Sequence, residues 1–178
     1  MFIRFDVAIL RLINQGCSNR LFDLLMPFIT QLGNEMIPFL LGLILLLLRK
    51  REYKISGALL LAGLTIKYNV VYFLKLWVGR PRPFEVLTNI NILEKASGFS
   101  FPSGHATTAF LVAFLMSARF KRPILFYSLA ALVGISRIYL GAHFPSDVAA
   151  GALIGIVLGY LLCRVTKPIE KQACLIYA

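Results

Sequence analysis

The stretch from Ser136 to Asp147 places an arginine, a histidine and a carboxylate at the mouth of an otherwise apolar segment. His143 and Asp147 are four residues apart, and Pro145-Ser146 between them predicts the start of a helix. A carboxylate at this position can hold one imidazole nitrogen as a donor and leave the other nitrogen as a nucleophile. The pairing therefore predicts a histidine that attacks an electrophilic centre.

A second polar stretch, Phe101-Pro102-Ser103-Gly104-His105, combines a turn with the start of a helix. Such a helix start leaves backbone N–H groups unpaired and presents the positive end of the helix dipole, which together form an anion site. His105 stands beside that site and can pass a proton to or from an oxygen near the anion. We expect Ser103 and Gly104 to bind an anion and His105 to act as an acid or a base.

Three cations accompany the histidines. Lys75 and Arg82 lie seven positions apart in a segment that Pro81 and Pro83 stiffen, and Arg137 lies in the first stretch. The planar guanidinium of arginine suits phosphate oxygens, and lysine adds a point charge. Together they predict a three-cation clamp for the charge on the equatorial oxygens of a transferring phosphoryl group.

These stretches resemble the three signature motifs of the type 2 phosphatidic acid phosphatase (PAP2) superfamily, which here read Lys75-x6-Arg82-Pro83, Pro102-Ser103-Gly104-His105 and Ser136-Arg137-x5-His143-x3-Asp147. All three are complete and occur in order. The likeness also extends to Asp23 and to the segment 30–34. The resemblance implies a membrane-embedded lipid phosphatase that uses no metal and no other cofactor.

The resemblance also implies a role for each residue of the motifs. His143 would attack phosphorus in line and form a phosphohistidine, while Asp147 orients and supports it. His105 would protonate the departing oxygen and then activate the water that releases phosphate. The phosphate oxygens would be held by Lys75, Arg82 and Arg137, with help from Ser103 and the Gly104 backbone N–H.

The elements that must position these residues are membrane helices. Of the 178 residues, 58% are hydrophobic and 15% are charged, whereas a soluble domain averages about 25% charged. We predict an all-α, single-domain bundle over residues 1–178, with six transmembrane helices at about 19–32, 35–49, 55–77, 104–119, 123–140 and 147–164. A tight turn is expected at Gly33-Asn34. Residues 2–15 predict an amphipathic surface helix or, alternatively, the start of the first span.

The distribution of basic residues predicts the orientation of this bundle. The net charge is +11, and most basic residues stand between the apolar runs, where they indicate topology rather than nucleic-acid binding. Placing both termini in the cytoplasm keeps three basic clusters inside: residues 49–54, 119–122 and 164–171. The lipid phosphate site then faces the periplasm from the inner membrane, and the oligomeric state stays open.

Several features leave alternatives open. Lys67 could face a polar cavity beneath the site or pair with a carboxylate or carbonyl. Arg80 could contact a lipid headgroup or be a solvated charge. Gly151, Gly155 and Gly159 predict close helix packing within the bundle, with dimerisation as the alternative. We expect no metal site, because zinc needs three or four close ligands and no cysteine lies near either histidine.

The substrate is not specified by the motifs. A site at the outer boundary of the bilayer predicts a lipid phosphate. The compact chain, together with its general likeness to small lipid A 1-phosphatases, favours the 1-phosphate of lipid A. Phosphatidylglycerol phosphate and undecaprenyl pyrophosphate are the alternatives among phosphatases. Transfer of phosphate to an acceptor lipid, or a lipid transporter that only binds phosphate, would use the same basic pocket without hydrolysis.

Overall fold

The computed structural model describes residues 2–166, and every regular element within them is helical. The elements, in chain order, are α1 (Phe2–Arg11), the π-helical turn η1 (Leu12–Gly16), α2 (Arg20–Gln31), α3 (Met36–Leu47), α4 (Arg51–Val78), α5 (Pro83–Val86), α6 (Gly104–Phe120), α7 (Pro123–Tyr139) and α8 (Pro145–Thr166). The residues of the predicted six spans thus all lie mainly in helices. The prediction of a cytoplasmic C-terminus concerns residues 167–178, which lie outside the described residues.

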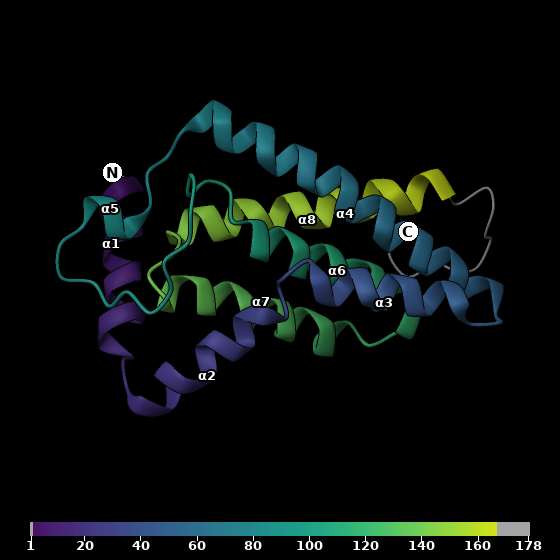
Figure 1. Cartoon of the computed structure of the whole chain (residues 1–178), viewed down its shortest axis with the longest axis horizontal. Helices are drawn as coiled ribbons and strands as arrows, with labels where there is room; N and C mark the ends of the chain where they lie inside the picture. The colour runs from purple at the N-terminus through teal and green to yellow at the C-terminus, as the bar shows by residue number, and fades with distance from the viewer. Residues whose placement is uncertain (1, 167–178) are drawn as a thin grey trace.

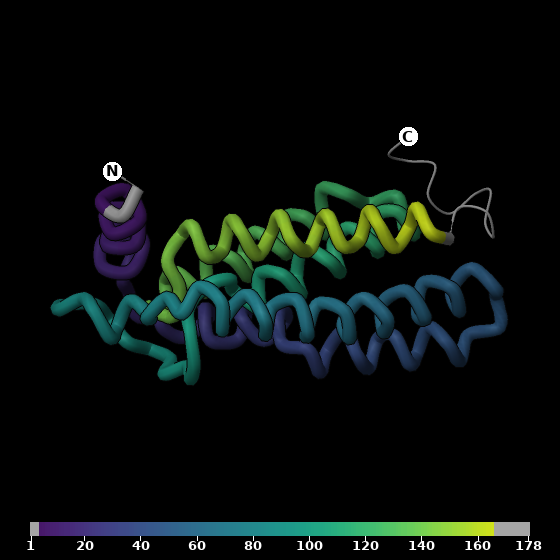
Figure 2. The backbone as a smooth tube through the Cα atoms, turned by 90° about the horizontal axis from the view of Figure 1, so that it is seen from above, coloured from purple at the N-terminus to yellow at the C-terminus, as the bar shows by residue number. Residues whose placement is uncertain are grey.

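The long helices run along one axis in two layers. Helices α3 and α4 form one layer, and α6, α7 and α8 form the other (Figures 1 and 2). Helix α6 contacts α4, α7 and α8, so it occupies the centre of the bundle. Helix α1 lies across the end of the bundle at which α6 and α8 begin (Figure 1). The signature residues therefore gather at this end, which we call the site end.

The glycine stripe of α8 explains the close approach of α8 to α6. A Cβ added to Gly151 would lie 2.6 Å from the Ser103 carbonyl oxygen, and one added to Gly159 would lie 2.8 Å from a Phe114 ring carbon. Only a residue without a side chain fits such spacing. The prediction that this stripe packs within the bundle is confirmed.

Two segments are long and apolar enough to cross a membrane: Arg51–Val86, which contains α4, and Pro145–Val165, which forms most of α8. The pair α2 and α3 passes the same test as one bent span, and α7 is a shorter apolar helix. Large apolar side chains are exposed along these helices, among them Leu24, Phe28, Leu47, Phe73 and Ile124. Such a surface suits contact with lipid tails.

The predicted tight turn at Gly33-Asn34 is present, since the Gly33 and Asn34 N–H groups donate to the Thr30 and Gln31 carbonyls at 2.9 Å, but it does not reverse the chain. Helices α2 and α3 are bent by 44° at this break, and the chain continues along the bundle instead of reversing (Figure 1). A Cβ added to Gly33 would lie 2.6 Å from Val133 Cγ1 and 3.0 Å from His105 Cβ. The glycine thus lets the break pack tightly on α6 and α7, and this packing favours a bend over a loop that leaves the bundle.

The predicted placement of the N-terminal helix opposite the site is wrong. Asp6 Oδ2 accepts a hydrogen bond from Arg80 Nη2 at 2.7 Å, and Asp6 Oδ1 accepts one from the Ser146 N–H at 2.8 Å. Leu10 is fully buried in a cluster with Ile138 and Phe144. These contacts hold α1 at the site end. The buried Asp6 carboxylate needs hydrogen-bond partners, and the apolar face of α1 needs to be packed against other apolar residues.

The basic clusters between the helices lie at the other end of the bundle. Helix α4 begins and helix α6 ends there, and Arg119 pairs with Glu52 across the two helices. Residues 49–54 and 119–122 are therefore separated from the site by the length of α6, about 25 Å for 17 residues.

Candidate active site

The nucleophile candidate His143 lies in the turn between α7 and α8. Gly141 has a φ of +73°, which this turn requires, and the backbone N–H groups of Ala142 and His143 donate to the Arg137 carbonyl at 3.1 and 3.3 Å. In the first turn of α8, Asp147 Oδ2 accepts from the Phe144 N–H at 2.9 Å. This side-chain cap explains why the helix start directs the Asp147 carboxylate back toward His143.

Asp147 and His143 face each other with a serine beside them. The Nδ1 atom of His143 lies 3.7 Å from Asp147 Oδ2, and Ser100 Oγ donates to the same Oδ2 while lying 3.4 Å from Nδ1. All three residues are at most 2% exposed. Ser100 was missed by the sequence reasoning, because it precedes the Pro-Ser-Gly-His motif and no pattern distinguishes it.

Arg80 lies beside the site residues and pairs with two carboxylates, so it is not a solvated charge. Its Nη1 donates to Asp147 Oδ1 at 2.5 Å and its Nη2 donates to Asp6 Oδ2 at 2.7 Å. Its guanidinium carbon lies 4.1 Å from the centre of the Phe144 ring. Arg80 therefore holds the carboxylate that faces His143. Only the tertiary fold brings Asp6 to this pair.

We expect Arg80→Gln to lower kcat by about 10- to 100-fold with little change in KM, because an ion pair to a buried carboxylate is lost. Steady-state phosphate release measures both constants. Arg122→Gln, an exposed change at the other end of the bundle, serves as the matched control. A raised KM with unchanged kcat would instead make Arg80 a headgroup contact.

Arg82 is buried, and most of its N–H groups donate to backbone carbonyls around the site. Its Nε donates to the Gly98 carbonyl at 2.7 Å, and its Nη1 donates to the Ala142 carbonyl at 2.9 Å. The same Nη1 lies 3.4 Å from His143 Nε2. Arg82 thus anchors the segment before α6 to the turn before α8. It also places positive charge where the second nitrogen of His143 points.

Arg137 is 1% exposed and retains a donor without a partner. Its Nη1 donates to Thr30 Oγ1 at 2.8 Å and to Glu94 Oε2 at 2.7 Å, while its buried Nε has no hydrogen-bond partner. A buried unpaired donor is costly, and an anionic ligand at this point would satisfy it. The family likeness around Thr30 thus corresponds to a hydrogen bond with Arg137. No sequence pattern indicated that Glu94 would pair with Arg137.

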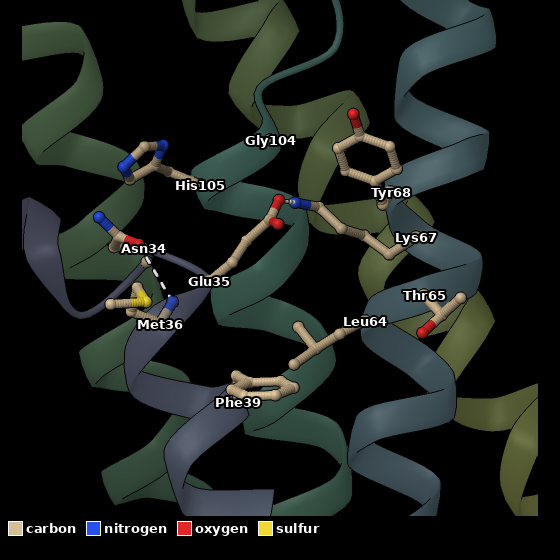
Figure 3. Close-up of a pocket in the computed structure, with 11 residues that line it drawn as sticks. Asn34, Glu35, Met36, Phe39, Leu64, Thr65, Lys67, Tyr68, Gly104 and His105 are labelled. Carbon is tan, nitrogen blue, oxygen red and sulfur yellow. Dashed lines mark hydrogen bonds and ion pairs between the residues drawn. The ribbon is translucent and has the colours of Figure 1, made fainter.

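The remaining predicted residues line the same end of the bundle. Lys75, in the last turn of α4, donates to the Phe99 carbonyl. Ser103 caps α6 by accepting from the Ala106 N–H at 3.4 Å, and its own N–H donates to the Asp147 carbonyl at 3.0 Å. Gly104 and His105 form the first turn of α6 and line a cavity that Lys67 and Glu35 also line (Figure 3).

The electrostatics of the site favour a neutral nucleophile. The pKa of His143 is lowered to about 4, mainly by burial and also by the cations Arg137 and Arg82, while Asp147 acts in the opposite direction. His143 therefore carries no proton on one ring nitrogen at neutral pH, which is the nucleophilic form. Within residues 2–166, no three His, Cys, Asp or Glu side chains gather closely enough to hold a metal ion.

Comparison with known proteins identifies the family. Residues 56–170 match the profile of the PAP2 superfamily. The chain therefore belongs to the PAP2 superfamily, as the three motifs predicted.

The chain is 36% identical over 123 residues to a decaprenylphosphoryl-5-phosphoribose phosphatase of Mycobacterium tuberculosis, a match that covers 69% of this chain and 66% of the relative, just under two thirds. It is 34% identical over 174 residues to an undecaprenyl-diphosphatase of Sulfolobus acidocaldarius, covering 95% of this chain and 83% of the relative.

Two solved structures share the fold. The crystal structure of Aquifex aeolicus LpxE has a TM-score of 0.79 and 32% identity, covering 89% of this chain and 94% of that one. The PAP2-type phosphatidylglycerolphosphate phosphatase of Bacillus subtilis has a TM-score of 0.80 and 27% identity, covering 96% of this chain and 88% of that one.

Proposed function

We propose that this protein removes the terminal phosphate of a membrane lipid through a phosphohistidine on His143, without a metal. The observation that carries the proposal is the setting of the His143 ring. One nitrogen faces Asp147 at 3.7 Å and the other faces Arg82 at 3.4 Å, in a buried site that also contains Arg137. Binding of phosphate alone would need the cations but not the paired histidine and carboxylate.

The reaction follows from this geometry in two steps. Nε2 of His143 bonds to phosphorus while the bond from phosphorus to the lipid oxygen breaks, and that oxygen keeps the electron pair and takes a proton from His105. Water then attacks phosphorus as His105 removes its proton, the P–N bond breaks, and its electron pair returns to Nε2. Lys75, Arg82, Arg137, Ser103 and the Gly104 N–H balance the charge on the phosphoryl oxygens.

A polyprenyl diphosphate is the substrate that we place first. The likeness to the undecaprenyl-diphosphatase of Sulfolobus acidocaldarius, which extends over 95% of the chain, supports this choice. Phosphatidylglycerol phosphate is the second candidate, supported by the shared fold of the Bacillus subtilis enzyme. The 1-phosphate of lipid A, which the compact chain favoured, stays a prediction.

We also propose the orientation of the bundle. The basic end faces the cytoplasm and the site end faces the periplasm from the inner membrane, with α8 leading to a cytoplasmic C-terminus. Helices α2 and α3 would then form one crossing, followed by α4, α6, α7 and α8, so the bundle has five crossings instead of six. Helix α1 would lie at the outer surface with Phe5 and Ile9 toward lipid, both of which are exposed.

Cys17 provides a test of this orientation. It is exposed at the end of η1, beside the site end, while Cys163 is buried. In intact cells that carry Cys174→Ser, we expect a membrane-impermeant maleimide to label Cys17, and Cys17→Ser to abolish the labelling. Labelling that occurs only after the membrane is permeabilised would place α1 in the cytoplasm.

The proposed activity is tested with purified protein in detergent and EDTA. Undecaprenyl pyrophosphate, phosphatidylglycerol phosphate and lipid A are offered side by side, and free phosphate is measured. We expect release from the pyrophosphate at a rate that EDTA leaves unchanged. Loss of activity with EDTA would overturn metal independence. Labelled phosphate recovered on a second lipid would show a transferase, and no reaction at all would favour a lipid transporter.

A further inference from the structure

The ion pair of Lys67 and Glu35 has no part in the reaction described above. Lys67 lies within α4 and its side chain is 2% exposed, whereas the Glu35 side chain, just before α3, is 50% exposed. An ionic group inside a membrane-spanning segment is expensive and commonly marks a functional site. Lys67 faces a cavity and also pairs with a carboxylate. Both alternatives that the sequence left open for this residue therefore apply.

The cavity opens where α3 and α4 diverge, and its volume is about 790 Å³. Farther from the site end the two helices touch, because a Cβ added to Gly42 would lie 2.8 Å from Leu61 Cδ2. Cavities of this size bind small molecules and parts of lipids. The glycine contact thus bounds the cavity on the side away from the site end.

The cavity has a charged part around Lys67 and Glu35 and an apolar part around Phe39 and Leu64. Figure 3 shows the Lys67 and Glu35 side chains meeting in the middle, with His105 and Asn34 on one side. Phe39 and Leu64 lie together farther along the cavity (Figure 3). This order suits a molecule with a charged head near His105 and an apolar chain beyond it.

The cavity adjoins the phosphate site on the side of the leaving group. Gly104 and His105 line it, and a Cβ added to Gly104 would lie 3.7 Å from Lys67 Nζ. In an in-line displacement the nucleophile and the leaving oxygen stand on opposite sides of phosphorus. His105 protonates the leaving oxygen in the proposed reaction. The leaving group, on the side of phosphorus opposite His143, must therefore lie toward this cavity.

We propose that this cavity binds the leaving lipid and that Lys67 binds a phosphate carried by it, which makes the substrate class a lipid diphosphate. When the bond from the terminal phosphorus to the bridging oxygen breaks, that oxygen keeps the electron pair and takes the proton of His105, and the phosphate that stays on the leaving lipid remains an anion beside the Lys67 ammonium. Glu35 holds Lys67 between turnovers and turns toward solvent when the diphosphate enters. A lipid monophosphate leaves as an alcohol and offers Lys67 no anion. This inference rests on the proposed function.

The test compares farnesyl diphosphate with farnesyl monophosphate as substrates of the full chain in detergent. Lys67→Met removes the ammonium and keeps the length of the side chain. We expect it to lower the ratio of kcat/KM for the diphosphate to kcat/KM for the monophosphate by about 10- to 100-fold, the range of a lost charge-assisted hydrogen bond. Lys54→Met, the same change at an exposed position of α4, should keep the wild-type ratio.

Each other outcome is decisive. An equal loss for both substrates, or complete loss of turnover in Lys67→Met, would make the pair structural and overturn the inference while the proposed function stands. Wild-type protein that hydrolyses neither farnesyl lipid would overturn the inference and the choice of a polyprenyl diphosphate, and release of phosphate from phosphatidylglycerol phosphate would show that the proposed function stands.

Binding gives a readout that does not need turnover. The thermal midpoint of unfolding is measured with a methylene-bridged farnesyl diphosphonate and with farnesyl phosphonate. We expect the diphosphonate to stabilise the wild-type protein more strongly, and Lys67→Met to remove that difference. Equal stabilisation of the wild-type protein by the two ligands would overturn the inference, whatever the kinetic result.

Discussion

Replacement of His143 by alanine is expected to lower kcat for phosphate release by about 10³- to 10⁶-fold, as for other covalent nucleophiles. The His143 ring is 2% exposed, and Arg82 lies 3.4 Å from its Nε2. In the variant, water can therefore hardly replace the imidazole as the nucleophile beside the cations. Release of phosphate from a diphosphate lipid by purified protein measures the effect. With substrate labelled at the terminal phosphate, acid-labile label should appear on wild-type protein and be absent from the variant.

His105→Ala provides the comparison for this experiment. It keeps the nucleophile but lacks both the acid of the first step and the base that activates water, so the protein should still take up label, more slowly than the wild type, and release it slowly. The thermal midpoint of each variant reports whether the bundle still folds. A His143→Ala variant that retains more than a tenth of the wild-type kcat would remove the phosphohistidine from the mechanism.

Asp147→Asn is expected to lower kcat by about 10³-fold while KM changes little, because the carboxylate orients the imidazole and stabilises its positive charge during attack. Asp147 is fully buried and receives hydrogen bonds from Arg80, Ser100 and the Phe144 N–H. An asparagine can keep the bonds from Ser100 and from the backbone, so the helix start survives. It loses the negative charge and the ion pair to Arg80.

Asp23→Asn is the matched control for this change. Asp23 also lies toward the site end, where it accepts a hydrogen bond from the Tyr139 hydroxyl at 2.5 Å, but it contacts none of the signature residues. We expect it to retain most of the wild-type kcat. If Asp147→Asn also retained kcat within tenfold, then Asp147 would serve only as the cap of α8.

Within residues 2–166, the helices could be predicted from the sequence because apolar runs and helix-start residues act over short distances. Ser103 and Asp147 cap the two helices whose first turns carry the site, and both positions were evident from local residue types. The residues of the three motifs were also evident, since each motif is short and contiguous. Their common location at one end follows from alternating helix directions.

The partners of the motif residues were not evident, because they come from distant parts of the chain. Asp6 and Arg80 are 74 residues apart, and Thr30 and Arg137 are 107 apart. The bend between α2 and α3 depends on Gly33 packing against Val133, which no local pattern encodes. Residue types and local spacing thus set the helices and the chemistry of the motifs. Packing of distant segments buries charged groups, and each buried charge needs a partner. This packing decided the location of α1 at the site end, the hydrogen bonds to Asp147 and the ion pair of Lys67.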